Sequence, residues 1–168
     1  MKEKHREAVK VFRENQGILR MSAAIRLGVP EHIIYEMFGA GILVKEERGL
    51  YRLEDMQPLG YPDFIQASLL VPKGVICLYS ALFFHGLTTQ IPYQVYIALP
   101  KNILRPKVNY PPLDIVWLSQ KPYQTGMEEH ILDGIKVKIY SREKTVADCF
   151  KFRNKVELSV ALQALKDY

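Results

Sequence analysis

The chain has 168 residues, of which 48% are apolar, and a formal net charge of +5, a composition typical of a globular rather than a disordered protein. No apolar run reaches about 18 residues, and the N-terminal MKEKHREAVKVF mixes acids with bases around no apolar core. These features argue against a membrane span and a signal peptide, and for a cytoplasmic protein with no membrane partner. The two cysteines, Cys77 and Cys149, lie far apart in apolar patterns, so we expect reduced core thiols without a metal or cofactor.

The net positive charge is unevenly distributed along the chain. Residues 1–55 carry 10 Lys and Arg against 9 Asp and Glu, whereas residues 56–168 carry 13 against 9. A basic surface that attracts nucleic acid must therefore be local in the first third, or lie in the remainder.

The first third of the chain predicts three helices followed by a two-stranded hairpin. A helix is expected over residues 3–14, a short extended piece over Ile18–Met21, and a second helix through Leu27 with Ser22 as its N-cap. After the break at Gly28, Pro30 suits the first turn of a third helix. Strands over Ile42–Val44 and Leu50–Leu53 complete the layout of a winged helix-turn-helix, a fold that holds one helix in a DNA groove.

The third helix and the hairpin supply candidate DNA contacts. Pro30, Ile33, Ile34, Met37 and Phe38 fall on one apolar face, which leaves His32, Tyr35 and Glu36 on the other. Phosphate contacts are expected from cations of the hairpin and of the second helix, namely Lys45, Arg48, Arg52, Arg20 and Arg26. The alternative is a protein-interaction module that no longer binds DNA, because the third helix holds Glu31 and Glu36 but no Lys or Arg.

A boundary is expected near Asp55 to Tyr61, where two prolines and a glycine cluster, which gives domains at 1–55 and 61–168. The second domain predicts helices over Asp63–Leu70 and Ser80–Gly86, then strands over Gln94–Leu99, Leu113–Ser119, Glu128–Leu132 and Ile135–Tyr140. Asp133-Gly134 predicts a tight hairpin. A helix capped by Ser141 and a last helix from Val156 follow. The expected fold class is α+β with a mostly antiparallel sheet in the second domain.

No catalytic signature accompanies these elements. Ser80 and His85 lack a G-x-S-x-G elbow and a third orienting group, so His85 is interpreted as a core histidine. Asp114, Glu128, Glu129 and Asp148 are the carboxylates that a metal-dependent nuclease would use, but their scattered spacing does not suit one ion. We therefore expect a protein that is not an enzyme.

The tract Arg142 to Lys155, REKTVADCFKFRNK, mixes cations with Phe150 and Phe152. It predicts a surface for nucleic acid or an acidic partner, carried by Lys144, Lys151, Arg153 and Lys155. The alternative is an amphipathic helix with Val146, Cys149 and Phe150 buried and a solvated basic face.

Four segments resemble the AbiEi-type antitoxins of type IV toxin-antitoxin (abortive infection) systems. They are RGLYRL (Arg48 to Leu53), PKGVICLYSALFFHGLTTQIP (Pro72 to Pro92), YPPLDIV (Tyr110 to Val116) and KTVADCFKFRNK (Lys144 to Lys155). The resemblance covers nearly the whole chain. Family members commonly continue with a further basic helical segment, which would follow Tyr168.

The resemblance implies an N-terminal winged helix that represses its own operon and a C-terminal domain that counteracts a nucleotidyltransferase-like toxin, with or without direct contact. The DNA-facing positions that it implies are Ser22, Arg26, His32, Ile33, Glu36, Arg48 and Arg52. Since a monomer offers few phosphate contacts, we expect a homodimer or a cooperative assembly on paired operator half-sites.

Overall fold

The computed structural model describes residues 2–47, 49–56 and 60–168. Arg48, one of the expected phosphate contacts, lies outside the described residues. The chain divides into two compact units, Met1–Pro62 with Asp133–Ile135, and Asp63–Leu132 with Lys136–Tyr168. Each unit is described by itself below. None of the described helices is long and apolar enough to cross a membrane.

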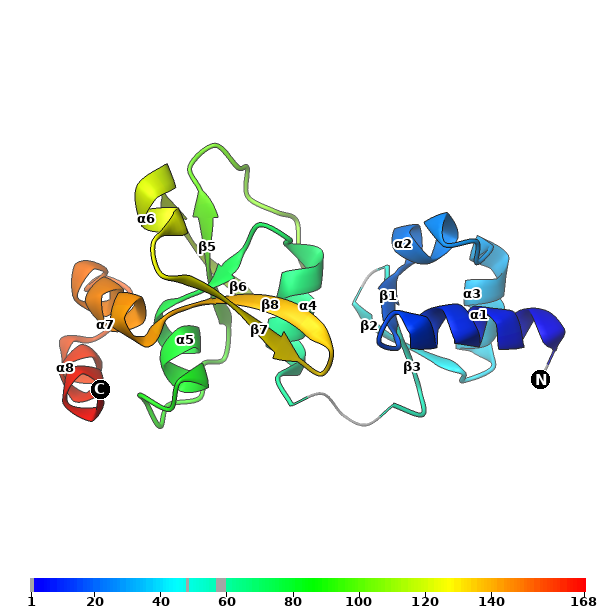
Figure 1. Ribbon diagram of the computed structural model, residues 1–168, viewed down its shortest axis with the longest axis horizontal. Coiled ribbons are helices and arrows are strands. Elements are labelled where there is room, and N and C mark those ends of the chain that lie inside the picture. Colours follow the sequence, from blue (N-terminus) through cyan, green and yellow to red (C-terminus); the bar gives the residue numbers. More distant parts are fainter. Residues whose placement is uncertain (1, 48, 57–59) are drawn as a thin grey trace. The chain divides into compact units, whose positions relative to one another are not determined.

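The first unit combines three helices with a small antiparallel sheet (Figure 1). Its elements are α1 (Glu3–Glu14), β1 (Ile18–Arg20), α2 (Met21–Arg26), α3 (Glu31–Gly39), β2 (Leu43–Glu47) and β3 (Leu50–Leu53). The strand order is β1-β3-β2, so β3 lies in the middle. Opposite Tyr51 of β3 stand Leu19 on one neighbouring strand and Lys45 on the other.

The helices of the first unit pack on one face of this sheet. Phe12 of α1, Ile34 and Met37 of α3, and Leu43 and Leu53 of the sheet are all at most 1% exposed and share one core. Because side chains alternate along a strand, Tyr51 and Leu53 point to this core while Arg52 points to the opposite face.

Two helix starts differ from the sequence-based expectation. Arg20, not Ser22, occupies the N-cap of α2, and no side chain caps it. Ser22 is an exposed residue of the first turn. Pro30 is the N-cap of α3 rather than its first residue. Met21 enters the helix directly from β1, and its N–H donates to the carbonyl of Gly49, which sets the earlier start.

The second unit places helices around a five-stranded sheet (Figure 1). Its elements are α4 (Pro62–Leu70), β4 (Val75–Ile76), α5 (Leu78–Phe84), β5 (Val95–Pro100), β6 (Leu113–Leu118), α6 (Gln120–Gln124), β7 (Met127–Leu132), β8 (Ile135–Tyr140), α7 (Arg142–Lys151) and α8 (Leu158–Asp167). The strand order is β6-β5-β4-β8-β7.

The sheet of the second unit is mixed, so the expectation of a mostly antiparallel sheet is wrong. β4 pairs antiparallel to β5, but β4 runs parallel to β8 and β5 runs parallel to β6. Parallel neighbours need a crossover of about a dozen residues, and residues 101–112 are such a connection. The α+β class is confirmed, with a mixed sheet in this unit.

α5, α7 and α8 lie together beside the sheet and enclose the main core of the second unit (Figure 1). Leu82, Tyr140, Cys149 and Ala161 are fully buried there. The predicted cap of α7 is confirmed, because the Ser141 hydroxyl accepts the N–H of Lys144. Hydroxyls at this position satisfy a first-turn N–H that the helix leaves unpaired.

Candidate nucleic-acid interface

The exposed face of α3 carries aromatic and acidic groups but no cation. His32 and Tyr35 are exposed, as expected, and so is the apolar Phe38, at 44%. The Phe38 ring meets the edge of the Tyr51 ring at a centroid distance of 6.0 Å. Burial raises the pKa of the Tyr51 hydroxyl, and the nearby Tyr35 and Glu31 raise it further, so this phenol stays neutral.

Ile33 is not part of that exposed face. Its side chain is only 3% exposed and packs in the core with Ile34 and Met37. The expectation of a DNA contact at Ile33 is therefore wrong, because the i, i+3, i+4 periodicity that makes α3 amphipathic turns this residue inward.

Glu36 is exposed, and its carboxylate contacts α1 and the residue before it. Its Oε2 lies 3.2 Å from the Lys2 Nζ and 3.2 Å from the His5 Nε2. The hydrogen bond from His5, followed by the bond and charge of Lys2, lowers the pKa of the Glu36 carboxyl. Its carboxylate joins α3 to α1 and stays 43% exposed, so the DNA contact at Glu36 remains a prediction.

The five cations expected at this interface differ in exposure and in ion pairing. Arg20 and Arg26 bracket α2, Lys45 lies on β2, and all three are exposed. Within the part of the chain that the structure describes, none of the three forms an ion pair. Arg48 lies outside that part.

Arg52 is already paired and mostly buried. Its guanidinium donates to the Glu46 carboxylate and, over 2.9 Å, to the carbonyl oxygen of Leu53. The side chain is 17% exposed. This corrects the assignment of Arg52 to a phosphate, because a new contact would require breaking a partly buried ion pair.

The expected basic surface on α7 separates into paired and exposed residues. The Lys144 Nζ lies 3.0 Å from the Asp148 Oδ1, and the two side chains are 12% and 9% exposed. Lys155 pairs with Asp114, whereas Lys151 and Arg153 are exposed. Lys144 is therefore not a surface cation, which corrects that assignment. Val146 and Cys149 are buried and Phe150 is partly buried, so α7 follows the amphipathic alternative.

Ser80 and His85 are held separately by the main chain. The Ser80 Oγ accepts the N–H of Tyr96 over 2.9 Å. The His85 Nε2 lies 2.8 Å from the carbonyl oxygen of Tyr140, so this nitrogen acts as the donor. Within the described ranges the two side chains are not bonded to each other, and His85 is the satisfied structural histidine that the sequence suggests.

The four carboxylates of the nuclease hypothesis are each engaged by a different basic side chain. Asp114 contacts Lys155, Glu128 contacts His130, Glu129 contacts Lys136 and Asp148 contacts Lys144. Burial raises the pKa of Asp148 and Lys144 partly opposes this. The described residues hold no group of three or more His, Cys, Asp and Glu side chains arranged for a metal ion.

Both cysteines are buried free thiols. Burial, reinforced by nearby Asp148, raises the pKa of Cys149 to about 12 and raises that of Cys77 well above its usual range. Since the thiolate is the reactive form, neither group is suited to nucleophilic chemistry at neutral pH.

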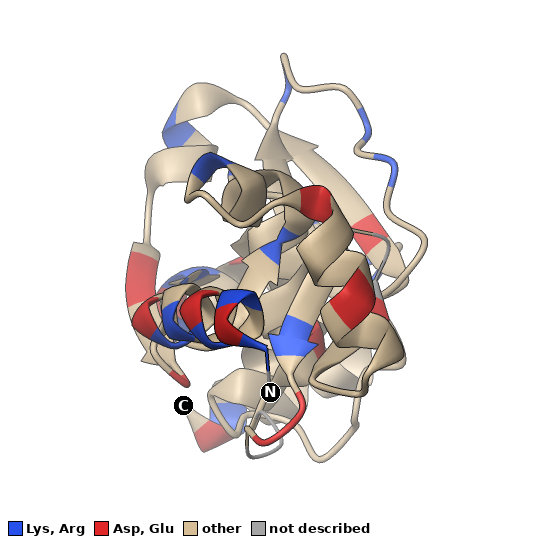
Figure 2. Cartoon of the chain, turned by 90° about the vertical axis from the view of Figure 1, so that its right-hand side faces the viewer, with Lys and Arg blue, Asp and Glu red and all other residues tan. Residues whose placement is uncertain are grey.

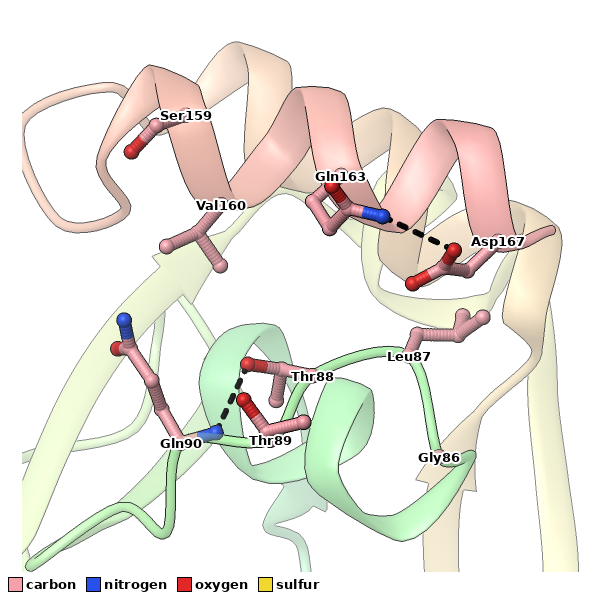
Figure 3. A pocket seen from close by; sticks show the side chains of 9 residues that line it. All are labelled: Gly86, Leu87, Thr88, Thr89, Gln90, Ser159, Val160, Gln163 and Asp167. Atoms are coloured by element: carbon pink, nitrogen blue, oxygen red, sulfur yellow. Dashed lines mark hydrogen bonds between the residues drawn. The ribbon is translucent and has the colours of Figure 1, made fainter.

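A pocket of about 450 Å³ lies between the loop after α5 and helix α8 (Figure 3). Its polar lining consists of neutral hydroxyls and amides from Thr88, Thr89, Gln90, Ser159 and Gln163, together with the carboxylate of Asp167. Gln163 donates to Asp167 over 3.0 Å. The lining contains neither a histidine nor a thiol, and its single carboxylate is bonded, so it resembles no acid-base or nucleophilic site.

The sequence did not indicate this pocket, because its two walls come from residues 86–90 and 159–167. Their approach depends on how α8 packs in the second unit. No periodicity or spacing within either segment signals it.

Comparison with known proteins does not assign the chain to a group. No protein-family model matches it, and no curated protein matches it significantly.

Proposed function

We propose that the chain is an antitoxin-type transcriptional regulator whose first unit binds operator DNA as a winged helix-turn-helix. The order α1-β1-α2-α3-β2-β3, with β3 between the other two strands, supports this proposal. In that arrangement α3 is the helix presented to the major groove, and β2 and β3 form the wing.

The observation that carries the proposal is the position, around α3, of three exposed cations that form no ion pair with any described residue. Arg20 and Arg26 stand at the two ends of α2, which packs against α3. Lys45 stands opposite Tyr51, whose ring touches Phe38 of α3. Phosphate contacts on either side of a groove position a recognition helix, while His32 and Tyr35 would face the bases.

The second unit is proposed to counteract a nucleotidyltransferase-like toxin. The support is the family resemblance of Pro72 to Pro92 and Lys144 to Lys155, two segments that contribute α5 and α7 to its core. If a nucleotidyltransferase-like toxin is encoded in the same operon, co-expression of the chain with that toxin should restore the growth that the toxin alone arrests. Growth arrest that persists at equal expression of both proteins would refute this part of the proposal.

The DNA-binding part is tested by a salt titration with the chain's own promoter fragment and with random DNA. Each phosphate contact contributes a slope of about −0.9 to log K against log salt. The variant Arg20→Ala with Arg26→Ala should therefore flatten the slope by about 1.8 on both DNAs. Lys4→Ala with Lys10→Ala, exposed on α1, is the control with the same charge change. Equal binding of wild type to promoter and random DNA would refute the regulator proposal.

A second candidate function is a protein-interaction module. The observation that favours it is the exposure of large hydrophobic side chains on α2, at its C-cap and on α3. Four of them are between 44% and 53% exposed, namely Ile25, Leu27, Tyr35 and Phe38. Contiguous exposed apolar patches mark protein–protein interaction sites. Under this alternative Phe38→Ala would weaken self-association or partner binding, while DNA affinity would be negligible at moderate salt.

A further inference from the structure

The connection between β5 and β6, residues 101–112, projects as a long loop; we call it the β5–β6 arm. It contains Lys101, Arg105 and Lys107 and no Asp or Glu. In Figure 2 the colour of Lys and Arg recurs along this loop, at the upper right, without the colour of Asp and Glu. No role in the fold or in the site described above accounts for this concentration of positive charge.

The arm is anchored at its root and stiffened beyond it. The N–H of Lys101 donates to the carbonyl of Leu118 over 3.1 Å, and the Trp117 indole N–H donates to the carbonyl of Ile103 over 2.9 Å. After Ile103 the arm has neither helix nor strand as far as Asn109. Pro106, Pro111 and Pro112 restrict their own φ angles and favour extended backbone at the residues before them.

The cations of the arm are not used within the chain. Lys101, Arg105 and Lys107 are exposed, and none forms an ion pair with a described residue. The next acid along the chain, Asp114, is held by Lys155 and Gln94. Leu104 beside them is 88% exposed.

The spacing of these cations suits a ligand with regularly repeated negative charge. Seven residues from Lys101 to Lys107 span at most roughly 20 Å at about 3.3 Å per residue, and three positive charges lie within that length. Duplex DNA carries one negative charge per about 1.7 Å of its axis. The hydrogen bonds at the root and the prolines restrict the arm, which reduces the conformational entropy that its backbone loses on binding.

We propose that the β5–β6 arm is a second DNA contact, in which Lys101, Arg105 and Lys107 bind the sugar-phosphate backbone of a duplex. Leu104, which is also exposed, then lies against the groove wall. The inference rests on the proposed function, since it takes the same ligand. It extends that function by giving the second unit a direct role in holding DNA, without sequence preference of its own.

The test is a salt titration of the full chain with the triple variant Lys101→Ala, Arg105→Ala and Lys107→Ala. Three lost phosphate contacts should flatten the slope by about 2.7, equally for promoter and random DNA. The matched control is Lys73→Ala, Lys136→Ala and Lys166→Ala, three exposed lysines elsewhere in the second unit. Arg105→Lys retains the charge and should keep the wild-type slope.

The outcomes separate this inference from the proposed function. A flatter slope in the arm variant but not in the control supports the proposal that the arm contacts DNA. This holds even if wild type binds its promoter no better than random DNA, a result that would refute only the proposed regulator function. An arm variant with the wild-type slope overturns the inference. Thermal unfolding followed by Trp117 fluorescence verifies that each variant is folded.

Discussion

The buried ion pair of Lys144 and Asp148 gives a direct test of whether α7 presents a basic surface or a packed face. Lys144→Met removes one partner and leaves the Asp148 carboxylate, 9% exposed, without its cation. Breaking a buried pair in this way costs about 3–5 kcal/mol, whereas an exposed lysine contributes within about 0.5 kcal/mol. A loss of 1 kcal/mol lowers the melting temperature of a unit of this size by about 4–8 °C. The second unit of the variant should therefore melt at least roughly 12 °C below that of wild type.

The assay is thermal unfolding followed by fluorescence of Trp117, the single tryptophan of the chain, which reports on the second unit. Lys151→Met is the matched control, with the same charge change on the same helix at an exposed position. The double variant Lys144→Met with Asp148→Asn should recover part of the loss, because it removes the unpaired charge. A Lys144→Met protein as stable as the Lys151→Met protein would refute the buried-pair interpretation.

Two further predictions concern side chains whose pKa values are shifted by the fold. Because folding lowers the pKa of the Glu36 carboxyl, this group stabilises the first unit at pH values above its ordinary pKa of 4.5. The stabilisation is lost as the pH falls through the lowered pKa. Wild type should therefore lose its stability advantage over Glu36→Gln on acidification. Thermal melts of both proteins from about pH 3 to pH 7 measure this, and an advantage that grew toward low pH would contradict it. Cys77 and Cys149 should react with an alkylating reagent slowly in the folded chain and rapidly in denaturant, because burial raises both pKa values. Equal rates in the two conditions, followed by mass spectrometry, would show that the thiols are accessible.

Local patterns in the sequence were sufficient to predict most helices, strands and turns. The apolar spacing of Ile33, Ile34 and Met37 predicted α3, Asp133-Gly134 predicted the turn between β7 and β8, and Ser141 predicted the start of α7. These signals depend only on residues close together in the sequence, so they can be recognised without tertiary information. The short helix α6 was missed, because its five residues include a proline and show no apolar period.

The candidate site was predicted less well, because exposure and pairing depend on residues distant in sequence. Glu36 binds Lys2 and His5 from α1, and Lys155 binds Asp114 from β6. The parallel pairing of β5 with β6 also contradicts the expected antiparallel order. A strand pattern specifies which residues face a core, but it leaves the direction of the neighbouring strand open.

The sequence by itself determined the α+β class, the positions of most helices and strands, and the presence of more cations than acids. Only the tertiary structure decided which of those cations remain available. Arg52 and Lys144 are held by acids in largely buried pairs, whereas Arg20, Arg26, Lys45 and the three cations of the β5–β6 arm remain exposed. The physical reason is that a charge count adds residues independently, while burial and pairing depend on which segments the fold brings within a few ångströms of each other.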